Sequence, residues 1–537
     1  ALKEKERLTV ITNSMEILLE LADVSGWNII STGGVMKEGY LAFLGSKTDE
    51  SIRSYYVDKV IFSCKALDLE WGIMESQEAF GSTKRAMIGS GRKKILVVDS
   101  SKFDQTAFSV AGSMKEVDII VTDKEPTERW KKHFEKYNVK CLYLAGLSLK
   151  EYDTMNTFEM KTAIHFGDNA LDRLKEIPYK RVLIITDPFV VQSKMINLIT
   201  APLNSAGIEY DIFHDVVPDA PVDKIAEGVK KFLEYQPEAV VAVGGGSAID
   251  SSKAIREFAL KINNYGKVGL IAIPTTSGTG SEVTSFAVVN DTAAHVKYPL
   301  ISESLTADEA ILDAELVKSV PPAITADTGM DVFTHALESY VSTAHNEFSS
   351  ALAEKAIEIC GVFLLRAYLD GSDMHARKKM HVASCLAGLS FNTAGLGITH
   401  SMAHQLGAMF HIPHGRANAM LLPHIVEFNS DINKHSKSQK EYLPAVKRYA
   451  NVAHILGLSN YNKVMTVRSL VNWIQFMQKE MNIPLTIQEL GTIAPEKYFA
   501  AIDKMADAAL ADACTVNNPR VPTKEDIIKI YTKLWSF

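Results

Sequence analysis

Four residues between positions 331 and 414 are of the types that bind a transition metal. They are Asp331, His335, His400 and His414. On a helix, the spacing Asp331-x-x-x-His335 places both side chains on one face, one turn apart. One carboxylate with three imidazoles suits a divalent first-row metal, Fe(II) or Zn(II). A histidine taken singly is more often a surface or core residue, so the prediction of a metal site depends on the combination.

A glycine loop upstream of these residues predicts an anion-binding turn. Residues 239–243 form an apolar run typical of a buried strand, which stops at the glycines 244–246. Ser247 then opens a helical stretch over residues 248–260. Backbone N–H groups at such a helix N-terminus approach a pyrophosphate closely, and the helix dipole favours its charge. The loop is not a G-x-G-x-x-G fingerprint, and Ser247-x-x-Asp250 could equally be a helix-capping box.

A second polar loop follows the next apolar stretch, residues 271–273. It reads Pro-Thr-Thr-Ser-Gly-Thr-Gly-Ser-Glu over residues 274–282, and its hydroxyl groups suit contacts with ribose and phosphate. Runs of this composition are also ordinary loops. Two such loops upstream of a metal-binding set indicate an enzyme that holds a nucleotide and a metal together.

Residues from about 157 to 537 resemble the iron-dependent (group III) alcohol dehydrogenases. The loops and the metal set match that family in order and spacing, and further segments match as well. These are Thr186-Asp187, Lys297-Tyr298-Pro299, Gly395-Leu396-Gly397-Ile398-Thr399-His400, and Asp512-Ala513-Cys514-Thr515 with Asn518-Pro519-Arg520. The resemblance implies a dehydroquinate-synthase-like fold, in which an α/β nucleotide-binding domain precedes an all-helical metal-binding domain.

The resemblance also assigns roles to individual residues. Asp331 and the three histidines match the family's metal ligands. Asp187 matches the acid that binds the adenosine ribose. A carboxylate there accepts a hydrogen bond from the 2′-hydroxyl and repels a 2′-phosphate, so the resemblance implies a preference for NAD(H) over NADP(H). The remaining cofactor contacts are expected from Asp219, Gly245, Gly246, Ser247, Asp250, Thr275, Thr276, Thr279 and Lys297.

The implied reaction is hydride transfer between NAD(H) and a short-chain aldehyde or primary alcohol, with Fe(II) as the metal and Zn(II) as the other candidate. His404 lies one turn beyond His400 and matches a family histidine near the nicotinamide, where it would relay a proton. A buried structural histidine is the alternative. Phe286 and Phe391 match positions that line the substrate pocket, although ordinary core packing explains either residue as well.

The first 146 residues predict a separate α/β unit, because strand-like runs alternate with helical ones. Strands are expected near residues 8–14, 29–34, 59–63, 95–99 and 117–122, and helices over 15–22 and 80–89. These segments resemble the C-terminal sensor domain of DeoR-type repressors, an incomplete phosphosugar-isomerase-like fold. The family's helix-turn-helix has no counterpart in the sequence, so no nucleic-acid partner is expected. Lys84, Arg85 and Lys102 could meet a phosphate, but solvated surface charge is the favoured interpretation.

Composition agrees with this organisation. A chain of 537 residues with a net charge of −7 argues against a nucleic-acid binder. Five cysteines without Cys-x-x-Cys spacing suit a reducing cytoplasm, and no apolar run is long enough to cross a membrane. We therefore predict a cytoplasmic homo-oligomer, dimeric or higher. Its expected domains are residues 1–146, a linker at 147–156, a nucleotide-binding domain at 157–321 and a helical metal-binding domain at 322–537.

Two other functions remain open from the sequence. One is a sugar-phosphate-responsive regulatory protein in which the dehydrogenase is a passenger. The other is a zinc enzyme like glycerol dehydrogenase acting on polyols, a group that uses fewer protein ligands than the four identified in this sequence.

Overall fold

The computed structural model places the chain in two compact units, residues 1–157 and 158–537. The residues that it describes are 7–21, 24, 26–37, 41–143, 158–263, 266–291, 296–431, 444–458 and 463–536. The predicted linker, 147–156, lies outside the described residues. Each unit is considered by itself.

The first unit is built on a four-stranded parallel sheet, β11-β10-β8-β5. Its strands are β5 (Val57–Phe62), β8 (Gly91–Val97), β10 (Ile119–Thr122) and β11 (Lys140–Tyr143). Helices α3 (Glu78–Gly89) and α4 (Glu128–Lys136) cover one face, where Trp130 and Phe134 pack on Leu96 and Ile120. The predicted strands and helices of this unit are therefore confirmed, within a few residues at each end.

Smaller elements complete the first unit. They are β1 (Thr9–Thr12), α1 (Met15–Leu21), β2 (Asn28–Ser31), β3 (Val35–Lys37), β4 (Ala42–Leu44), α2 (Ser46–Arg53), β6 (Ala66–Asp68), β7 (Gly72–Glu75) and β9 (Ser109–Gly112). Strands β1 and β2 pair in parallel, β3 and β4 form a hairpin, and β6-β7-β9 form an antiparallel sheet. The carboxylate of Asp49 joins α2 to α3, because it accepts from the hydroxyls of Ser82 and Thr83 at 2.5 and 2.7 Å.

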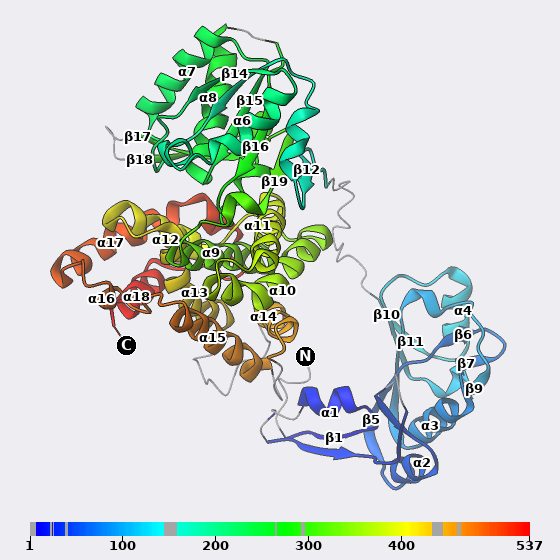
Figure 1. The fold of residues 1–537 in the computed structure, drawn as a ribbon. Coiled ribbons are helices and arrows are strands. Elements are labelled where there is room, and N and C mark those ends of the chain that lie inside the picture. Colours follow the sequence, from blue (N-terminus) through cyan, green and yellow to red (C-terminus); the bar gives the residue numbers. More distant parts are fainter. Residues whose placement is uncertain are drawn as a thin grey trace. The chain divides into compact units, whose positions relative to one another are not determined.

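The second unit begins with a six-stranded sheet in the order β12-β19-β16-β15-β13-β14, parallel throughout (Figure 1). The strands are β12 (Ala163–Phe166), β13 (Arg181–Ile185), β14 (Glu209–Phe213), β15 (Ala239–Gly244), β16 (Gly269–Pro274) and β19 (Glu309–Leu312). Successive residues of β13 and β15 face opposite sides, and both sides are apolar. Such continuous apolar runs are typical of a parallel sheet that helices cover on both faces.

The covering helices lie on the two faces of this sheet. Helices α7 (Val222–Tyr235) and α8 (Gly246–Asn263) pack on one face, and α6 (Ile196–Ser205) packs on the other. From β13 the chain passes outward to the edge strand β14 and returns to β15 on the opposite side of β13. The carboxyl ends of β13 and β15 therefore meet at the topological switch point, where open α/β sheets bind ligands.

After Pro321 the described residues of the second unit contain helices and no strand, as predicted. The helices are α9 (Pro322–Val341), α10 (Glu347–Leu369), α11 (Met374–Ala394), α12 (Ile398–Phe410), α13 (His414–Ser430), α14 (Pro444–Ile455), α15 (Lys463–Glu480), α16 (Ile487–Leu490), α17 (Pro495–Ala511) and α18 (Lys524–Trp535). Helix α9 has a proline in its first turn and is buried along nearly all of its remaining length. Helices α10, α11, α13 and α14 pack against it (Figure 1).

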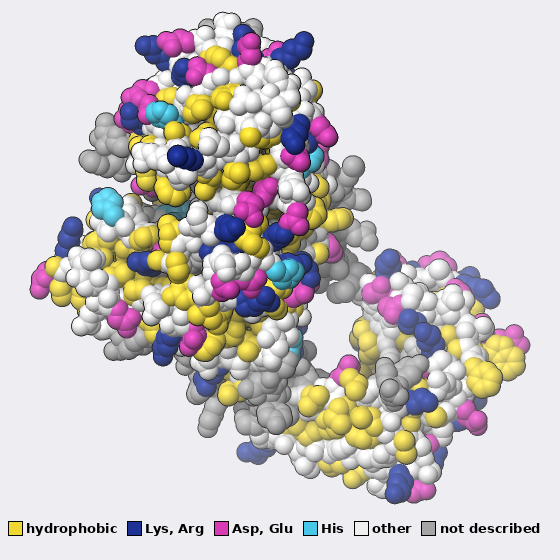
Figure 2. All heavy atoms as spheres, in the orientation of Figure 1, with side chains coloured by type: hydrophobic (Ala, Val, Ile, Leu, Met, Phe, Trp, Pro, Cys, Tyr) yellow, Lys and Arg dark blue, Asp and Glu magenta, His cyan; other side chains and the backbone are white. Residues whose placement is uncertain are grey.

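Within the described residues, no single helix passes the test for a membrane span, and only α11 with α12, bent by 107°, passes as a pair. Figure 2 shows lysine and arginine side chains mixed with aspartate and glutamate on the visible face of each unit.

Candidate metal and nucleotide site

The four predicted metal ligands come together from three helices. Asp331 and His335 lie one turn apart on α9, His400 lies in the first turn of α12, and His414 is the first residue of α13. Their ligand atoms all lie within 4.8 Å of one another. Oδ1 of Asp331 is 3.8 Å from Nε2 of His400 and 3.7 Å from Nε2 of His414. Side chains separated by more than 80 residues in the sequence thus converge on one small volume.

The surroundings of this group suit a cation. Asp331, His335 and His400 are buried, whereas the side chain of His414 is 40% exposed. Nε2 of His400 and Nδ1 of His335 are buried without a hydrogen-bond partner among the described residues, which is costly unless something binds them. Burial holds the pKa of His400 well below its ordinary value, so the ring is neutral, as a metal ligand must be. The donor set and its unpaired nitrogens fit a divalent metal.

A carboxylate behind His400 fixes the orientation of that ring. Glu338 lies on α9, and its Oε2 is 2.7 Å from Nδ1 of His400. The same carboxylate accepts from the backbone N–H groups of Gly397 and Thr399 at 2.9 and 2.7 Å. Nδ1 of His400 is thereby engaged, and Nε2 is left facing Asp331. The sequence interpretation missed Glu338, although it lies seven residues after Asp331 and so on the same face of the helix.

Helix α13 is held tightly against α9. The amide nitrogen of Asn418 donates to Oδ1 of Asp331 at 2.7 Å, and Arg416 forms a two-pronged ion pair with Asp327. A Cβ added at Gly415 would lie 2.1 Å from the backbone oxygen of Asp327, so only glycine permits this approach. The close contact keeps His414 within reach of Asp331.

His404 occupies the exposed side of the group. Its ring stacks on His414 with centroids 5.4 Å apart, and its Nδ1 is 2.8 Å from Oδ2 of Asp512. Burial raises the pKa of Asp512, but the hydrogen bond and charge of His404 outweigh it and lower this pKa to about 2. Of the two predicted pocket residues, Phe391 stacks on His335 at 4.6 Å, whereas Phe286 begins β17 (Phe286–Asp291) and is partly buried.

The predicted nucleotide loop lies at the switch point of the sheet. Gly244 ends β15 with a φ of 148°, and α8 begins two residues later. Asp187 follows β13 and caps α5 (Pro188–Gln192) through Oδ1. Its Oδ2 lies 3.2 Å from the position that a Cβ on Gly244 would take. The carboxylate therefore faces the glycine turn, with no side chain between them.

The second polar loop packs against the first. The backbone N–H of Thr275 donates to the oxygen of Gly244 at 3.0 Å. A Cβ on Gly246 would lie 2.7 Å from the methyl group of Thr279, and one on Gly245 would lie 3.4 Å from the hydroxyl of Thr276. The two loops thus form one cradle, in which glycine leaves the backbone accessible.

The cradle also contacts the helical region next to the metal ligands. A Cβ on Gly278 would lie 2.8 Å from Thr328 of α9, which precedes Asp331 by one turn. Ser277 and His381 of α11 are joined by a 3.0 Å hydrogen bond. The same loop therefore contacts both the glycine turn and α9, the helix that carries Asp331 and His335.

Two of the predicted cofactor residues form hydrogen bonds within the protein, and the side chain of a third is not described. Ser247 accepts from the backbone N–H of Asp219 at 3.1 Å. Asp250 accepts from the hydroxyl of Ser281 at 2.5 Å and from the backbone N–H of Val288 at 3.0 Å, so it ties α8 to the second loop and is not half of a capping box. The side chain of Lys297, in β18 (Val296–Ile301), lies outside the described residues.

A buried charged cluster beneath the second loop escaped the sequence interpretation. Lys253 of α8 is fully buried and donates to Ser281 and to the backbone oxygens of Thr284 and Phe286. Burial lowers the pKa of Lys253 to about 8 and raises that of the neighbouring Glu282 to about 7. Nothing in the local sequence distinguishes Lys253 from an exposed helical lysine.

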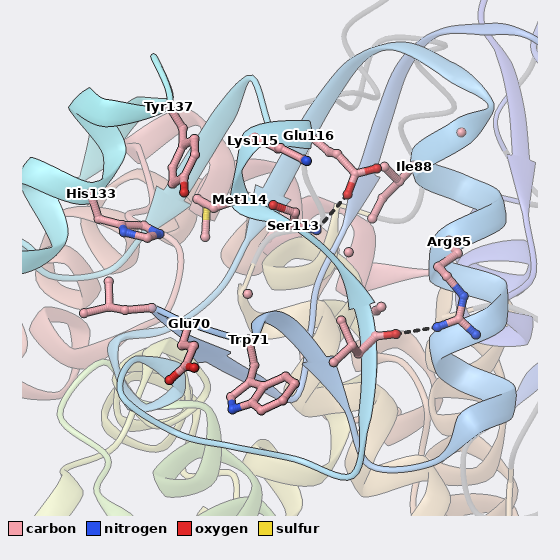
Figure 3. A pocket seen from close by; sticks show the side chains of 16 residues that line it. Glu70, Trp71, Arg85, Ile88, Ser113, Met114, Lys115, Glu116, His133 and Tyr137 are labelled. Carbon is pink, nitrogen blue, oxygen red and sulfur yellow. Dashed lines mark hydrogen bonds between the residues drawn. The ribbon is translucent and has the colours of Figure 1, made fainter.

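The first unit contains an open hollow of about 590 Å³ beside α3 and the β6-β7-β9 sheet (Figure 3). Arg85, Lys115 and His133 line it together with Glu70, Trp71 and Tyr137. Arg85 donates to the backbone oxygen of Val110 there. Lys84, which we expected to be a solvated surface charge, is largely buried and lies 4.0 Å from Glu75. That expectation was wrong for Lys84, because α3 turns its side chain into the unit.

The second unit joins a doubly wound sheet, with a glycine turn at its switch point, to a helical region with an Asp/His cluster, and this architecture fits an oxidoreductase. Two family models match in succession: "Iron-containing alcohol dehydrogenase" over residues 161–314 and "Fe-containing alcohol dehydrogenase family, C-terminal" over residues 325–535. The chain belongs to the iron-containing alcohol dehydrogenase family, as predicted. In the first unit, a model of the DeoR C terminal sensor domain matches residues 1–124, which confirms the second resemblance.

Relatives and solved structures agree with this membership. The chain is 42% identical over 371 residues to 1-propanol dehydrogenase PduQ of Citrobacter freundii, covering 68% of this chain and 96% of that protein. It is 36% identical over 394 residues to the NADPH-dependent butanol dehydrogenase of Clostridium saccharobutylicum, covering 70% and 97%. A crystal structure of 1,3-propanediol oxidoreductase superposes with a TM-score of 0.64 at 30% identity, covering 71% of this chain and all of that one. The predicted fold class is confirmed.

Proposed function

We propose that this protein is an NAD(H)- and Fe(II)-dependent alcohol dehydrogenase that interconverts short-chain aldehydes and primary alcohols. The observation that carries the proposal is the group of Asp331, His335, His400 and His414, in which two buried ring nitrogens lack hydrogen-bond partners among the described residues. Relatives named for 1-propanol, butanol and 1,3-propanediol support a small primary alcohol as the substrate class.

These four side chains would hold the metal, and Glu338 would keep His400 in the ligating orientation. A bound divalent metal supplies Lewis-acid stabilisation of the substrate oxygen as its negative charge develops. The exposed side of His414 marks the direction from which a small substrate can approach. His404 stands on that side with its Nδ1 beside Asp512, which suits it to carry the proton that completes the alcohol.

The cofactor contacts follow from the cradle at the switch point. Gly245 and Gly246 would let the pyrophosphate approach the N-terminus of α8, and Thr276 and Thr279 face it from the second loop. Asp187 supports NAD(H), because its carboxylate would accept from the 2′-hydroxyl of the ribose and repel a 2′-phosphate. One relative is named as NADPH-dependent, so cofactor choice varies among the relatives and has to be measured for this chain.

The test is an anaerobic assay of NADH oxidation with aldehydes of two to four carbons, with and without added Fe(II). We expect turnover that requires metal, and a preference for Fe(II) over Zn(II) would separate this function from a zinc polyol dehydrogenase. The His400→Ala variant should lose bound metal and activity while it keeps its fold. If the variant retained wild-type metal content and activity, the assignment would be wrong.

A regulatory function of the first unit is the second candidate. The DeoR-sensor match and the hollow lined by Arg85, Lys115 and His133 favour binding of an anionic metabolite by this unit. A thermal-shift screen of the whole chain with sugar phosphates tests it. Regulation would be supported if a sugar phosphate raised the temperature at which the first unit unfolds and also changed the rate of aldehyde turnover. If no sugar phosphate changed any unfolding temperature, this candidate would be removed.

A further inference from the structure

A second group of metal-ligand side chains lies beside the first. His404, Asp512 and Cys514 offer an imidazole nitrogen, a carboxylate oxygen and a thiol sulfur that all lie within 4.8 Å of one another. His404 is on α12, and Asp512 precedes the short helical turn η8 (Ala513–Asn517) that carries Cys514. All three residues are partly exposed.

Backbone geometry fixes the arrangement of this trio. The N–H of Cys514 donates to Oδ1 of Asp512 at 2.9 Å, which sets the spacing of the carboxylate and the thiol in the turn. Oδ2 of the same carboxylate is 2.8 Å from Nδ1 of His404. Thr515 of the turn donates to the hydroxyl of Ser401, and this bond ties η8 to α12 at 2.8 Å. The three donors are therefore held together before any ion arrives.

The donor types differ from those of the first group. One thiolate, one imidazole and one carboxylate make a three-ligand set of the kind that Zn²⁺ accepts with a fourth position left to water. The first group contains no sulfur, and soft thiolate ligands select zinc-like ions over harder ones. As the sulfur–metal bond forms, the S–H bond of Cys514 breaks and its proton passes to solvent, without any change of oxidation state.

We propose that His404, Asp512 and Cys514 form a second, inhibitory site for a thiophilic divalent cation, with Zn²⁺ as its natural occupant. The ring of His404 stacks on His414 and lies 6.3 Å from that of His400, so an ion at the trio is immediately beside the first group. Such an ion takes the imidazole that the proposed reaction needs for proton transfer. Binding at the trio is independent of the proposed function, and the inhibition rests on it.

Cobalt(II) distinguishes the two groups by spectroscopy. Metal-free full-length protein titrated with Co²⁺ should take up two ions, and one of them should give an intense thiolate-to-cobalt charge-transfer band in the near ultraviolet. Cys514→Ser should abolish that band and keep the other ion. His400→Ala should do the reverse. Absence of the charge-transfer band in the wild type overturns the site. Persistence of the band in both Cys514→Ser and Cys514→Ala also overturns it, because one of the four other cysteines would then be the source of the band.

A second measurement tests inhibition. The Fe(II)-loaded protein is titrated with Zn²⁺ while aldehyde reduction is followed, and each protein is compared with its own zinc-free rate. Loss of a direct ligand should raise the inhibitory zinc concentration at least about tenfold in Cys514→Ser. Equal zinc sensitivity of variant and wild type overturns the inhibitory role. If neither protein reduces aldehydes, the proposed function fails, and the cobalt spectra still decide whether the site exists.

Discussion

Replacing Glu338 by glutamine tests whether the residue behind His400 prepares the metal site. Three donors converge on this buried carboxylate: the backbone N–H groups of Gly397 and Thr399 and Nδ1 of His400. Glutamine has the same shape, but one of its two terminal positions is an NH₂ group. In one orientation this group faces the N–H of Thr399, and in the other it faces Gly397 and His400.

Both orientations have a measurable consequence. Each hydrogen bond to a charged group contributes about 1.5–3 kcal/mol, and a buried donor left facing another donor costs about 1–3 kcal/mol. We therefore expect the free energy of unfolding of the metal-free protein to fall by roughly 2–4 kcal/mol. An NH₂ group facing Nδ1 of His400 also favours the tautomer with hydrogen on Nε2, which cannot ligate. Metal affinity should drop by about 10–100-fold, or roughly 1.4–2.7 kcal/mol.

The assay combines urea unfolding of the metal-free protein with Fe(II) or Co²⁺ titration. Glu315→Gln is the matched control, because Glu315 pairs with Lys318 at the surface and should change stability by less than about 0.5 kcal/mol. If Glu338→Gln binds metal as tightly as the wild type does, Glu338 does not orient His400 and the reasoning fails.

Three further predictions follow from other parts of the molecule. Asp187→Gly should shift the NAD/NADP ratio of kcat/KM towards NADP by about tenfold or more, since it removes the repulsion between the carboxylate and the 2′-phosphate of NADP. An unchanged ratio would show that Asp187 does not contact the ribose. The pKa of Glu282 in the folded protein is about 7, above its value in the unfolded chain, so its contribution to folding stability is complete below about pH 4.5 and is lost as pH rises through 7. Urea unfolding should therefore show that the free energy of unfolding falls by up to roughly 3 kcal/mol over this pH range in the wild type but not in Glu282→Gln. If the free energies of unfolding of the two proteins changed in parallel with pH, the prediction would be contradicted. A shortened chain beginning at Phe158 should fold, bind metal and reduce aldehydes as the whole chain does, because residues 158–537 form a compact unit; an insoluble or inactive product would assign residues 1–157 to the working enzyme.

The sequence predicted the parts of this fold that depend on local periodicity. The buried strand β15 and the helical pair of Asp331 and His335 lie where the pattern placed them, because apolar runs and i, i+4 spacing are properties of neighbouring residues. The strands of the β6-β7-β9 sheet are only three or four residues long and carried no such signal.

Contacts between distant segments were beyond prediction from residue patterns. Glu338 acts on a histidine 62 residues away, and Asp512 contacts a histidine 108 residues away. Lys253 is buried beneath a loop whose Ser281, 28 residues later, accepts a hydrogen bond from it. Residue types, spacing and family resemblance pointed to the four candidate metal ligands, but Glu338, which contacts His400, emerged only once the helices were packed together.

The proposed metal ligands come from three helices, and this origin would link the amount of active protein to the supply of metal. An ion shared by α9, α12 and α13 would fasten segments that otherwise separate when the chain opens, and it would bind only the closed form. At a free metal concentration of about one hundred times Kd, metal binding would stabilise the folded state by about 2.7 kcal/mol. The fraction of open molecules would then be about a hundredfold smaller than without metal. A cell short of metal would therefore hold more opened chains, and proteases would clear them. Enzyme abundance would then fall with metal availability, without any change in gene expression.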